Sequence, residues 1–169
     1  LRKHEFVGTN AFKVLVDPKL SPTGDVIVYA ALTDGNTSPG QGGVWRSLDT
    51  GKTWQRMRAG QATDIQIDYN SASAQSGNLQ VIFGGFAGDG VYRSSNRGQS
   101  WFIMAGTTGD PLIQDPNVTP QRPVDVANQT NPNGAFGRIV LAHPALIPGD
   151  VSQNLAYQTW LYAAVATPD

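Results

Sequence analysis

The chain has 169 residues, a net charge of −1 at pH 7 and no cysteine. The balanced charge leaves no electrostatic footprint for nucleic acid or for an anionic membrane surface, and without cysteine the chain forms neither disulfides nor thiolate metal sites. No apolar run approaches the roughly 18 residues that span a bilayer. The 19 glycines and 11 prolines, with only 15% charged residues, favour a turn-rich β protein over a helical bundle.

Three short strand-like runs open the chain. The first, residues 4–8, ends in glycine and resembles the ends of two later segments, so we expect the outer strand of a preceding repeat. Residues 12–18 form the second run, which Pro18 is expected to end because proline cannot donate a hydrogen bond to the sheet. Residues 26–31 are apolar throughout, which predicts a strand buried on both faces.

A β-hairpin is predicted over residues 42–54, where strand formers precede a turn around Gly51 and a second strand run follows. A copy with the same pattern follows at 89–101, displaced by 47 residues. The same displacement relates further pairs: Arg46 and Arg93, and Met57 and Met104. Self-similarity at such a period is typical of repeat architectures with one supersecondary unit per repeat.

The turn residues of the two copies resemble a known motif. Ser47-x-Asp49-x-Gly51-x-Thr53-Trp54 is similar to the Asp-box (BNR repeat), the Ser-x-Asp-x-Gly-x-Thr-Trp hairpin of sialidase-type β-propellers. Similar repeats occur in sortilin-like receptors, xyloglucan-cleaving glycosidases and photosystem assembly factors. The second copy has Asn96 in place of the aspartate, and its box residues are Ser94, Asn96, Gly98, Ser100 and Trp101. In the family the box is mostly a structural fold-back, so the resemblance implies a fold more than an activity.

The strands that precede each hairpin repeat as well. Residues 64–68 and 79–86 flank a polar turn, and residues 138–144 and 160–165 begin a third unit. The central strands share an aromatic residue followed by two small ones: Tyr29-Ala30-Ala31, Phe83-Gly84-Gly85 and Tyr162-Ala163-Ala164. Small residues recurring there fit strands crowded near a propeller axis.

The predicted fold class is all-β, with four-stranded antiparallel propeller blades that carry Asp-box hairpins. Blades of 47 residues give this chain about three at most, whereas propellers need roughly 4–8. We therefore interpret residues 1–169 as part of one β-propeller domain, an incomplete propeller fragment. We expect residues 1–11 to be the end of a preceding blade, and residues 12–60 and 61–107 to be two full blades. Residues 108–135 are expected to be an inserted loop, and residues 136–169 the start of a third blade.

A binding site is expected on the face where the loops after the second and fourth strands of each blade emerge. The loop at 33–42 and the insertion at 108–135 both belong to this face, and long irregular loops are frequently functional. The insertion is expected to follow an extended path anchored by Leu112 and Ile113, because its prolines prevent a regular strand. The candidate binding residues are Asp34, Asn36, Asp89, Leu112 and Ile113. Neither loop contains Trp, Tyr or Phe, which favours a scaffold over a sugar cleft.

Asp34 is the candidate catalytic residue. Thr33-Asp34, followed by residues 42–46, is similar to the xyloglucanase pattern in which a Thr-Asp pair precedes Gly-Gly-x-Tyr-Arg and the aspartate is one of two catalytic carboxylates. Inverting glycosidases place the two carboxylates ~6.5–9.5 Å apart, and the partner would have to lie outside this sequence. The chain also departs from the pattern by inserting seven residues between Asp34 and Gly42. Thr-Asp-Gly is, moreover, ordinary turn chemistry.

A sialidase site has weaker support. It requires an Arg-Ile-Pro segment, whereas Arg138-Ile139 is followed by Val140. Arg46 and Arg93 are repeat equivalents, so we interpret them as structural residues that bridge strands rather than as substrate ligands.

No cofactor and no metal site are expected, because His4 and His143 are far apart in the sequence and the aspartates lack calcium-loop spacing. Three glycan acceptor sequons permit an extracellular location: Asn36-Thr37-Ser38, Asn117-Val118-Thr119 and Asn128-Gln129-Thr130. The leading interpretation is a non-enzymatic scaffold, adhesion or assembly module at an extracellular, cell-surface or periplasmic location. Its partners would be a protein, the remaining propeller blades or a glycan, with no nucleic acid and no membrane span. The alternative is a fragment of a xyloglucanase- or sialidase-like glycoside hydrolase.

Overall fold

The structure is a computed structural model that describes residues 6–35, 39–68, 71, 80–106, 137–145, 147, 149–157 and 160–166. Within these ranges the chain is mostly β-strand in antiparallel sheets, with one short helix, α1 (Val151–Tyr157). The expected all-β class is therefore confirmed. The described residues between 12 and 106 contain no α-helix, whereas α1, in the third unit, was not predicted. No helix of the described residues has the length and apolar character to cross a membrane.

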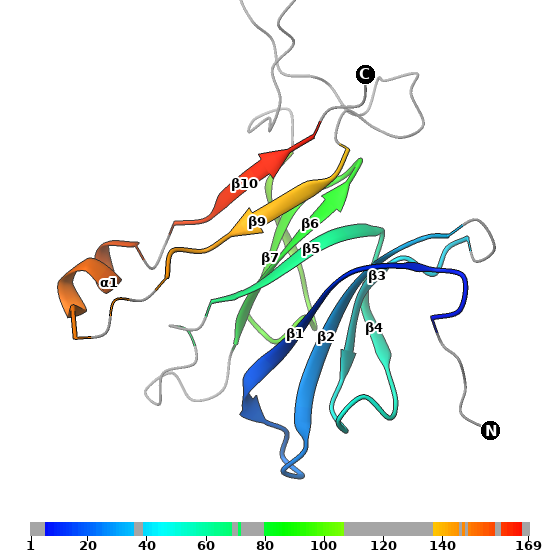
Figure 1. The fold of residues 1–169 in the computed structure, drawn as a ribbon, viewed down its shortest axis with the longest axis horizontal. Helices are drawn as coiled ribbons and strands as arrows, with labels where there is room; N and C mark the ends of the chain where they lie inside the picture. The colour runs from blue at the N-terminus through cyan, green and yellow to red at the C-terminus, as the bar shows by residue number, and fades with distance from the viewer. Residues whose placement is uncertain are drawn as a thin grey trace, which may run out of the picture.

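Three sheets follow one another along the chain (Figure 1). The first contains, in order, β1 (Asn10–Leu20), β2 (Val26–Thr33), β3 (Gly43–Ser47) and β4 (Gln55–Ala59). The second repeats this order with β5 (Gln61–Asp68), β6 (Val81–Ala87), β7 (Gly90–Ser94) and β8 (Phe102–Ala105). The third consists of β9 (Ile139–Ala142) and β10 (Tyr162–Val165). Every paired strand runs antiparallel to its neighbour.

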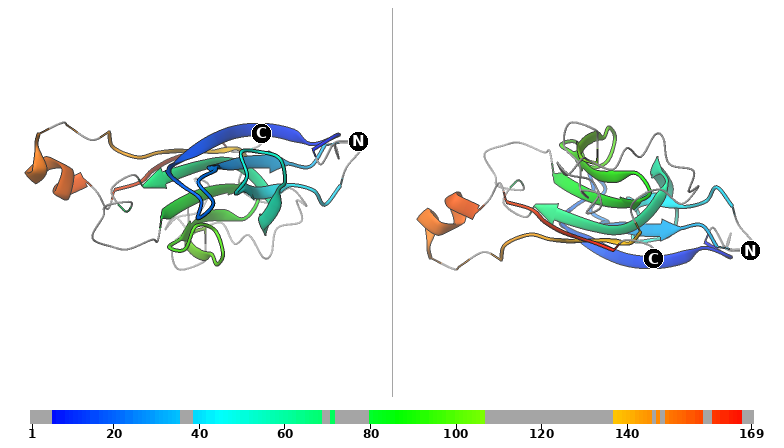
Figure 2. Two further views of the ribbon diagram at one scale, coloured as in Figure 1. Left: turned by 90° about the horizontal axis from the view of Figure 1, so that it is seen from below. Right: turned by 90° about the horizontal axis from the view of Figure 1, so that it is seen from above.

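The first strands of the sheets, β1, β5 and β9, lie side by side, and the second sheet lies between the other two (Figures 1 and 2). The register repeats from sheet to sheet: Tyr29 pairs with Arg46 on β3, and Phe83 pairs with Arg93 on β7. We call the face that a sheet turns toward the following sheet its forward face, and the opposite face its rear face. Tyr29 lies on the forward face of the first sheet, and Phe83 lies on the forward face of the second.

Two expectations for the N-terminal strands were wrong. Pro18 does not end β1, which continues to Leu20 through an irregularity in its pairing with β2 between Val16 and Leu20. A bulge accommodates proline because the residue there has no ladder hydrogen bond to lose. Residues 6–8, expected as part of an outer strand, form a turn instead. Phe6 in that turn packs edge-on against Trp45 and Trp54 of the first sheet.

The core between the first and second sheets is built from apolar side chains that alternate along their strands. Its fully buried members are Ile27, Tyr29, Ala31, Val44, Ala62, Ile65, Ile67, Ile82 and Phe86. The expectation that residues 26–31 form a buried strand is largely confirmed, since β2 is buried from Tyr29 to Thr33 and half-buried at Val26 and Val28.

A second cluster fills the space between the second and third sheets and contains Val81, Phe83, Val91, Ile139 and Leu141. The small residues of the central strands allow this close approach. A Cβ on Gly85 would lie 2.8 Å from the Ile139 side chain, and one on Gly84 would lie 2.7 Å from the Phe86 ring. Gly85 therefore lets the third sheet cover the forward face of the second sheet closely, whereas Gly84 makes room for the Phe86 ring on the rear face.

Candidate functional site

The first repeat turn, residues 47–54, joins β3 to β4 through a closed set of hydrogen bonds. Ser47 Oγ donates to Asp49 Oδ1 over 2.7 Å and accepts the Gly51 N–H at 2.8 Å. Asp49 also accepts the Thr53 N–H at 2.8 Å and the Thr53 hydroxyl at 2.6 Å. The Trp54 indole N–H donates to the Gly51 carbonyl over 3.1 Å. The polar groups of the turn thus form hydrogen bonds with one another, as expected of a turn with a structural role.

The second repeat turn, residues 94–101, has the same connections between β7 and β8. Ser94 Oγ lies 2.9 Å from Asn96 Oδ1 and accepts the Gly98 N–H at 2.8 Å. Asn96 Oδ1 accepts the Ser100 N–H, and the Trp101 indole donates to the Gly98 carbonyl, both at 2.9 Å. The substitution of asparagine reverses one bond, because Asn96 Nδ2 donates to Ser100 Oγ at 2.8 Å where the Thr53 hydroxyl donates to Asp49.

Each turn holds two consecutive residues in the left-handed region. Thr50 and Arg97 have φ of 61° and 58°, and the glycines that follow have φ of 82° and 85°. A left-handed conformation is uncommon for residues other than glycine. The side-chain hydrogen bonds across each turn therefore stabilise a conformation that the backbone alone disfavours.

The charge of Asp49 makes the first repeat turn sensitive to acid. Hydrogen bonds from the Thr53 hydroxyl, the Thr53 N–H and the Ser47 hydroxyl lower the pKa of Asp49 from 3.8 to about 2. A lowered pKa means that the stabilisation is complete above the unfolded-state value and is lost as the pH falls toward about 2.

Asp49→Asn, which copies the second turn, is therefore expected to remove this pH dependence. Parent and variant should differ in Tm at pH 5 and converge as the pH falls from about 4 to about 2. Thermal unfolding followed by circular dichroism at half-unit pH steps measures the difference. A constant offset between the two chains across that range would contradict the assignment.

The two turn tryptophans take equivalent positions, and both are half-buried. Trp101 packs on the buried ring of Phe86 between the first two sheets. Trp54, on the rear side of the first sheet, contacts Phe6 instead. The two tryptophans contact different residues because the first sheet covers the rear face of the second sheet. None of the described sheets covers the rear face of the first.

Asp34 lies at the opposite edge of the first sheet and is hydrogen-bonded through its N–H and both carboxylate oxygens. Its carboxylate accepts the Gly42 N–H at Oδ1 and the Gln61 amide at Oδ2, the latter over 2.9 Å. Its own N–H donates to Gln61 Oε1, also over 2.9 Å. Backbone hydrogen bonds from Gly40 and Gly42 lower the pKa of Asp34. The lowered pKa does not suit a general acid. The hydrogen bonds form a loop staple that joins the β2–β3 loop to the start of β5.

Asp89 is engaged in a second contact at the same edge. It accepts the Tyr92 hydroxyl at 2.6 Å and forms an ion pair with Arg58 of β4 at 2.6 Å. The Arg58 guanidinium lies over the rings of Tyr92 and Phe86, 3.6 and 4.0 Å from their centroids. Burial, with help from Asp89, raises the pKa of Tyr92. Asp89 thus fixes the second sheet to the outer strand of the first.

The remaining candidates fall outside the described residues. Asn36, Leu112 and Ile113 are among them, as are the insertion 108–135 and the asparagines of all three sequons. Of the candidate binding set, the structure brings Asp34 and Asp89 to one edge, the edge at which the β2–β3 and β6–β7 loops emerge, as predicted. No group of three or more His, Cys, Asp or Glu side chains suited to a metal occurs among the described residues.

Sequence reasoning missed the polar residues of β5 that hold the third sheet. Asp64, 3% exposed, accepts the Leu141 N–H at 2.7 Å and an ion pair from Lys13 of β1 at 2.8 Å. Thr63 Oγ1 bonds both the N–H and the carbonyl of Ile139, and the Gln66 amide donates to the Leu141 carbonyl. The side chains of β5 therefore occupy the edge of β9 that faces them.

A second buried polar cluster joins the first sheet to the second repeat turn. Arg46 is 7% exposed, and its Nη1 donates to the Arg97 carbonyl over 2.8 Å. Asp17 accepts the Tyr29 hydroxyl at 3.3 Å and lies 3.8 Å from Arg97 Nε. Burial, with Asp17 beside it, raises the pKa of Tyr29. Arg46 thus connects two sheets, whereas its repeat equivalent Arg93 is exposed.

Comparison with known proteins identifies no relative: no protein-family model matches the chain, and neither the curated proteins nor the solved structures contain a match.

Proposed function

We propose that this chain is part of an Asp-box β-propeller that acts as a non-enzymatic scaffold outside the cytoplasm. In this proposal the stacked sheets are the rigid frame, and the edge with Asp34 and Asp89 presents loops to a protein or glycan partner. Two features support the frame. The sheets repeat one register and one turn, and the inner strands β1, β5 and β9 lie side by side as blades do around an axis.

The observation that carries the proposal is a difference between equivalent positions of β1 and β5. Val14 and Val16 on the first sheet are 60% and 54% exposed. Ile65 and Ile67, at the same register in the second sheet, are fully buried beneath the first sheet. An apolar sheet face of this kind is normally covered. In the proposal a further blade of the same propeller covers the rear face of the first sheet.

The hydrogen bonding of the loop edge supports presentation rather than catalysis. The Asp34–Gln61 staple and the Asp89–Arg58 pair each tie a loop to a neighbouring strand or sheet. Loops positioned by a rigid scaffold are common places for binding. The carboxyl group proposed for glycoside hydrolysis is, by contrast, occupied by donors and has a lowered pKa.

The proposal is tested by assaying the chain for turnover and for binding in parallel. We expect no hydrolysis of xyloglucan oligosaccharides or sialyllactose, and binding on a glycan or extracellular-protein array that is lost when residues 39–41 are replaced by Gly-Ser-Gly. The matched control is Lys52→Glu in the first repeat turn, at the opposite edge, which should leave binding unchanged. If the chain hydrolyses either substrate and Asp34→Asn abolishes the turnover, the chain is a glycosidase. If only Lys52→Glu weakens binding, the binding site lies at the edge of the repeat turns and not at the loop edge.

A further inference from the structure

The forward face of the first sheet contains a seat for the second repeat turn. Arg46 supplies a hydrogen bond to the Arg97 carbonyl, and Met57 of β4 packs against Gly98. A Cβ on Gly98 would lie 3.3 Å from Met57 Cβ and 3.4 Å from its Cγ. The seat therefore recognises two features of the turn: an outward-facing carbonyl on the left-handed residue and a following glycine without a side chain.

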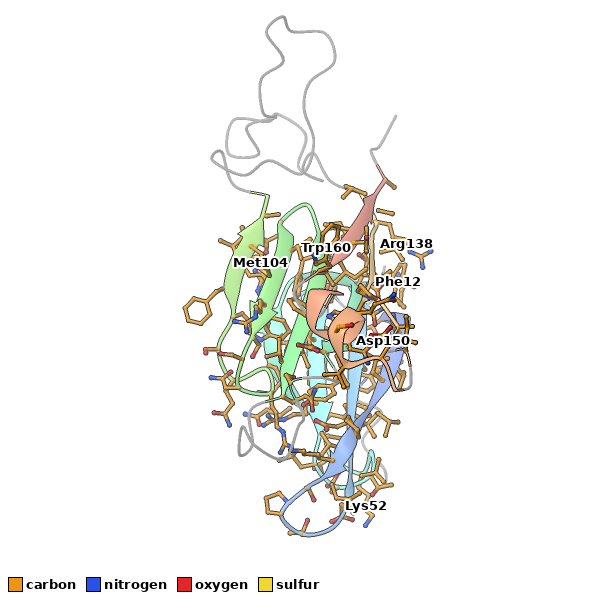
Figure 3. All side chains as sticks on the ribbon, turned by 90° about the vertical axis from the view of Figure 1, so that its left-hand side faces the viewer. Phe12, Lys52, Met104, Arg138, Asp150 and Trp160 are labelled. Atoms are coloured by element: carbon orange, nitrogen blue, oxygen red, sulfur yellow. The ribbon has the colours of Figure 1, made fainter. Side chains whose placement is uncertain are left out.

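The second sheet has the same seat in the same register. Arg93 pairs with Phe83 and Phe102, as Arg46 pairs with Tyr29 and Gln55. Met104, labelled in Figure 3, lies on the outer strand β8 two residues after Phe102, as Met57 lies two residues after Gln55. No described residue forms a hydrogen bond or ion pair with the Arg93 side chain, Met104 is 44% exposed and Phe102 is 64% exposed.

The third sheet reaches only the inner half of this face. Strand β9 contacts β5 and β6, and Val165 of β10 packs against the cluster that contains Phe83. Within the described residues β10 pairs with β9 alone. In the first and second sheets the second strand also pairs with a third strand, which leads into the repeat turn. In the third sheet, a hairpin equivalent to β3–β4 and β7–β8 would pair with the free edge of β10. Its turn would then lie on the seat formed by β7 and β8.

We propose that Arg93 and Met104 form a docking seat for a β-hairpin with the Ser-x-Asp/Asn-x-Gly turn, which pairs with the edge of β10. Arg93 binds the carbonyl of the left-handed turn residue, and Met104 packs on the glycine that follows. The inference rests on the contact between the first two sheets, and it holds whether or not the loop edge binds a partner.

A second copy of this chain does not fit as the occupant. Its uncovered turn, residues 47–54, belongs to a full four-stranded sheet. Docking that turn on Arg93 would place the β1 and β2 strands of the second copy where β9 and β10 already lie. The seat instead fits a two-stranded hairpin with nothing on its inner side.

The test supplies such a hairpin by fusing a second copy of residues 39–60 after Asp169. We expect a higher Tm for the fused chain. Arg93→Ala should lower the folding equilibrium constant by a factor that is ~10-fold larger in the fused chain than in the parent, because only there does it remove a buried hydrogen bond from a charged group. Arg93→Lys should fall between, since it keeps the charge but not the planar group of donors.

Two controls separate docking from a general change in stability. Lys52→Ala, an exposed cation in the native first repeat turn (Figure 3), should have the same effect in both chains. Asparagine, which tolerates the left-handed conformation but adds a side chain, in place of the glycine of the appended turn should remove the rise in Tm. The proposal is wrong if Arg93→Ala acts equally in parent and fused chains, or if the fused hairpin raises Tm only through concentration-dependent association in sedimentation velocity. Either result would leave the loop-edge binding assay unaffected.

Discussion

Asp64→Ala is expected to lower the free energy of unfolding by about 2–5 kcal/mol, although the substitution creates only a small cavity. The carboxylate accepts two buried backbone donors, the Leu141 N–H and the Ile65 N–H, each at 2.7 Å. A buried donor left without a partner costs about 1–3 kcal/mol. The Lys13 ion pair adds less, because the Lys13 side chain is 29% exposed and its ammonium can be hydrated when the partner is removed.

Urea unfolding monitored by tryptophan fluorescence measures the loss, and two matched variants assign its source. Asp64→Asn keeps one acceptor oxygen, so only one of the two N–H groups loses its acceptor, and it should cost less than Asp64→Ala. Lys13→Met removes the cation but leaves the buried carboxylate without its counter-ion. It should therefore also destabilise the chain, by less than Asp64→Ala because both backbone N–H groups keep their acceptor. Amide hydrogen exchange in β9 should accelerate in Asp64→Ala before exchange in β2, because a backbone N–H of β9 loses its acceptor, whereas the first sheet loses only the ion pair of the partly exposed Lys13. A free energy within about 0.5 kcal/mol of the parent would show that water replaces the carboxylate at this position.

The example of Asp64 also shows why the sequence predicted the strands better than their packing. Strand periodicity and turn chemistry are local properties, so the sheets and the two repeat turns could be predicted from residue types and spacing. In residues 64–68 polar and apolar residues alternate, a pattern that indicates one face in water. In a stack of sheets there is no such face. The polar side chains contact β9 instead, and nothing local to β5 indicates this.

The candidate site divides in the same way. The edge at which the loops emerge follows from the order of antiparallel strands, and it was predicted. The roles of individual residues depend on partners far along the chain: Gln61 is 27 residues from Asp34, and Arg58 is 31 residues from Asp89. No periodic signal connects such pairs. A resemblance suggested catalysis at Asp34, but it could not predict the hydrogen bonds that Asp34 accepts from Gly42 and Gln61.

Phe86→Ala is expected to lower the free energy of unfolding by about 3–5 kcal/mol, the usual range for removing a buried phenylalanine. The ring is 0% exposed and lies in the core between the first two sheets. It meets Tyr92 and Trp101 edge-on, with centroids 5.5 and 6.1 Å away. Gly84, which lies next to the ring, has no side chain that could fill the space left by alanine.

The consequence for the fold is specific, because Phe86 connects elements of both sheets. The Arg58 guanidinium of β4 stacks on the Phe86 ring, so Phe86→Ala should also weaken the Arg58–Asp89 ion pair at the loop edge. Phe102→Ala is the matched control: the same residue type on β8, 64% exposed, should change the free energy by about 0.5 kcal/mol or less. Chemical denaturation of the three chains, with the Arg58 side-chain resonances followed by NMR, measures both effects. Equal losses for Phe86→Ala and Phe102→Ala would mean that the two sheets do not share this core in solution.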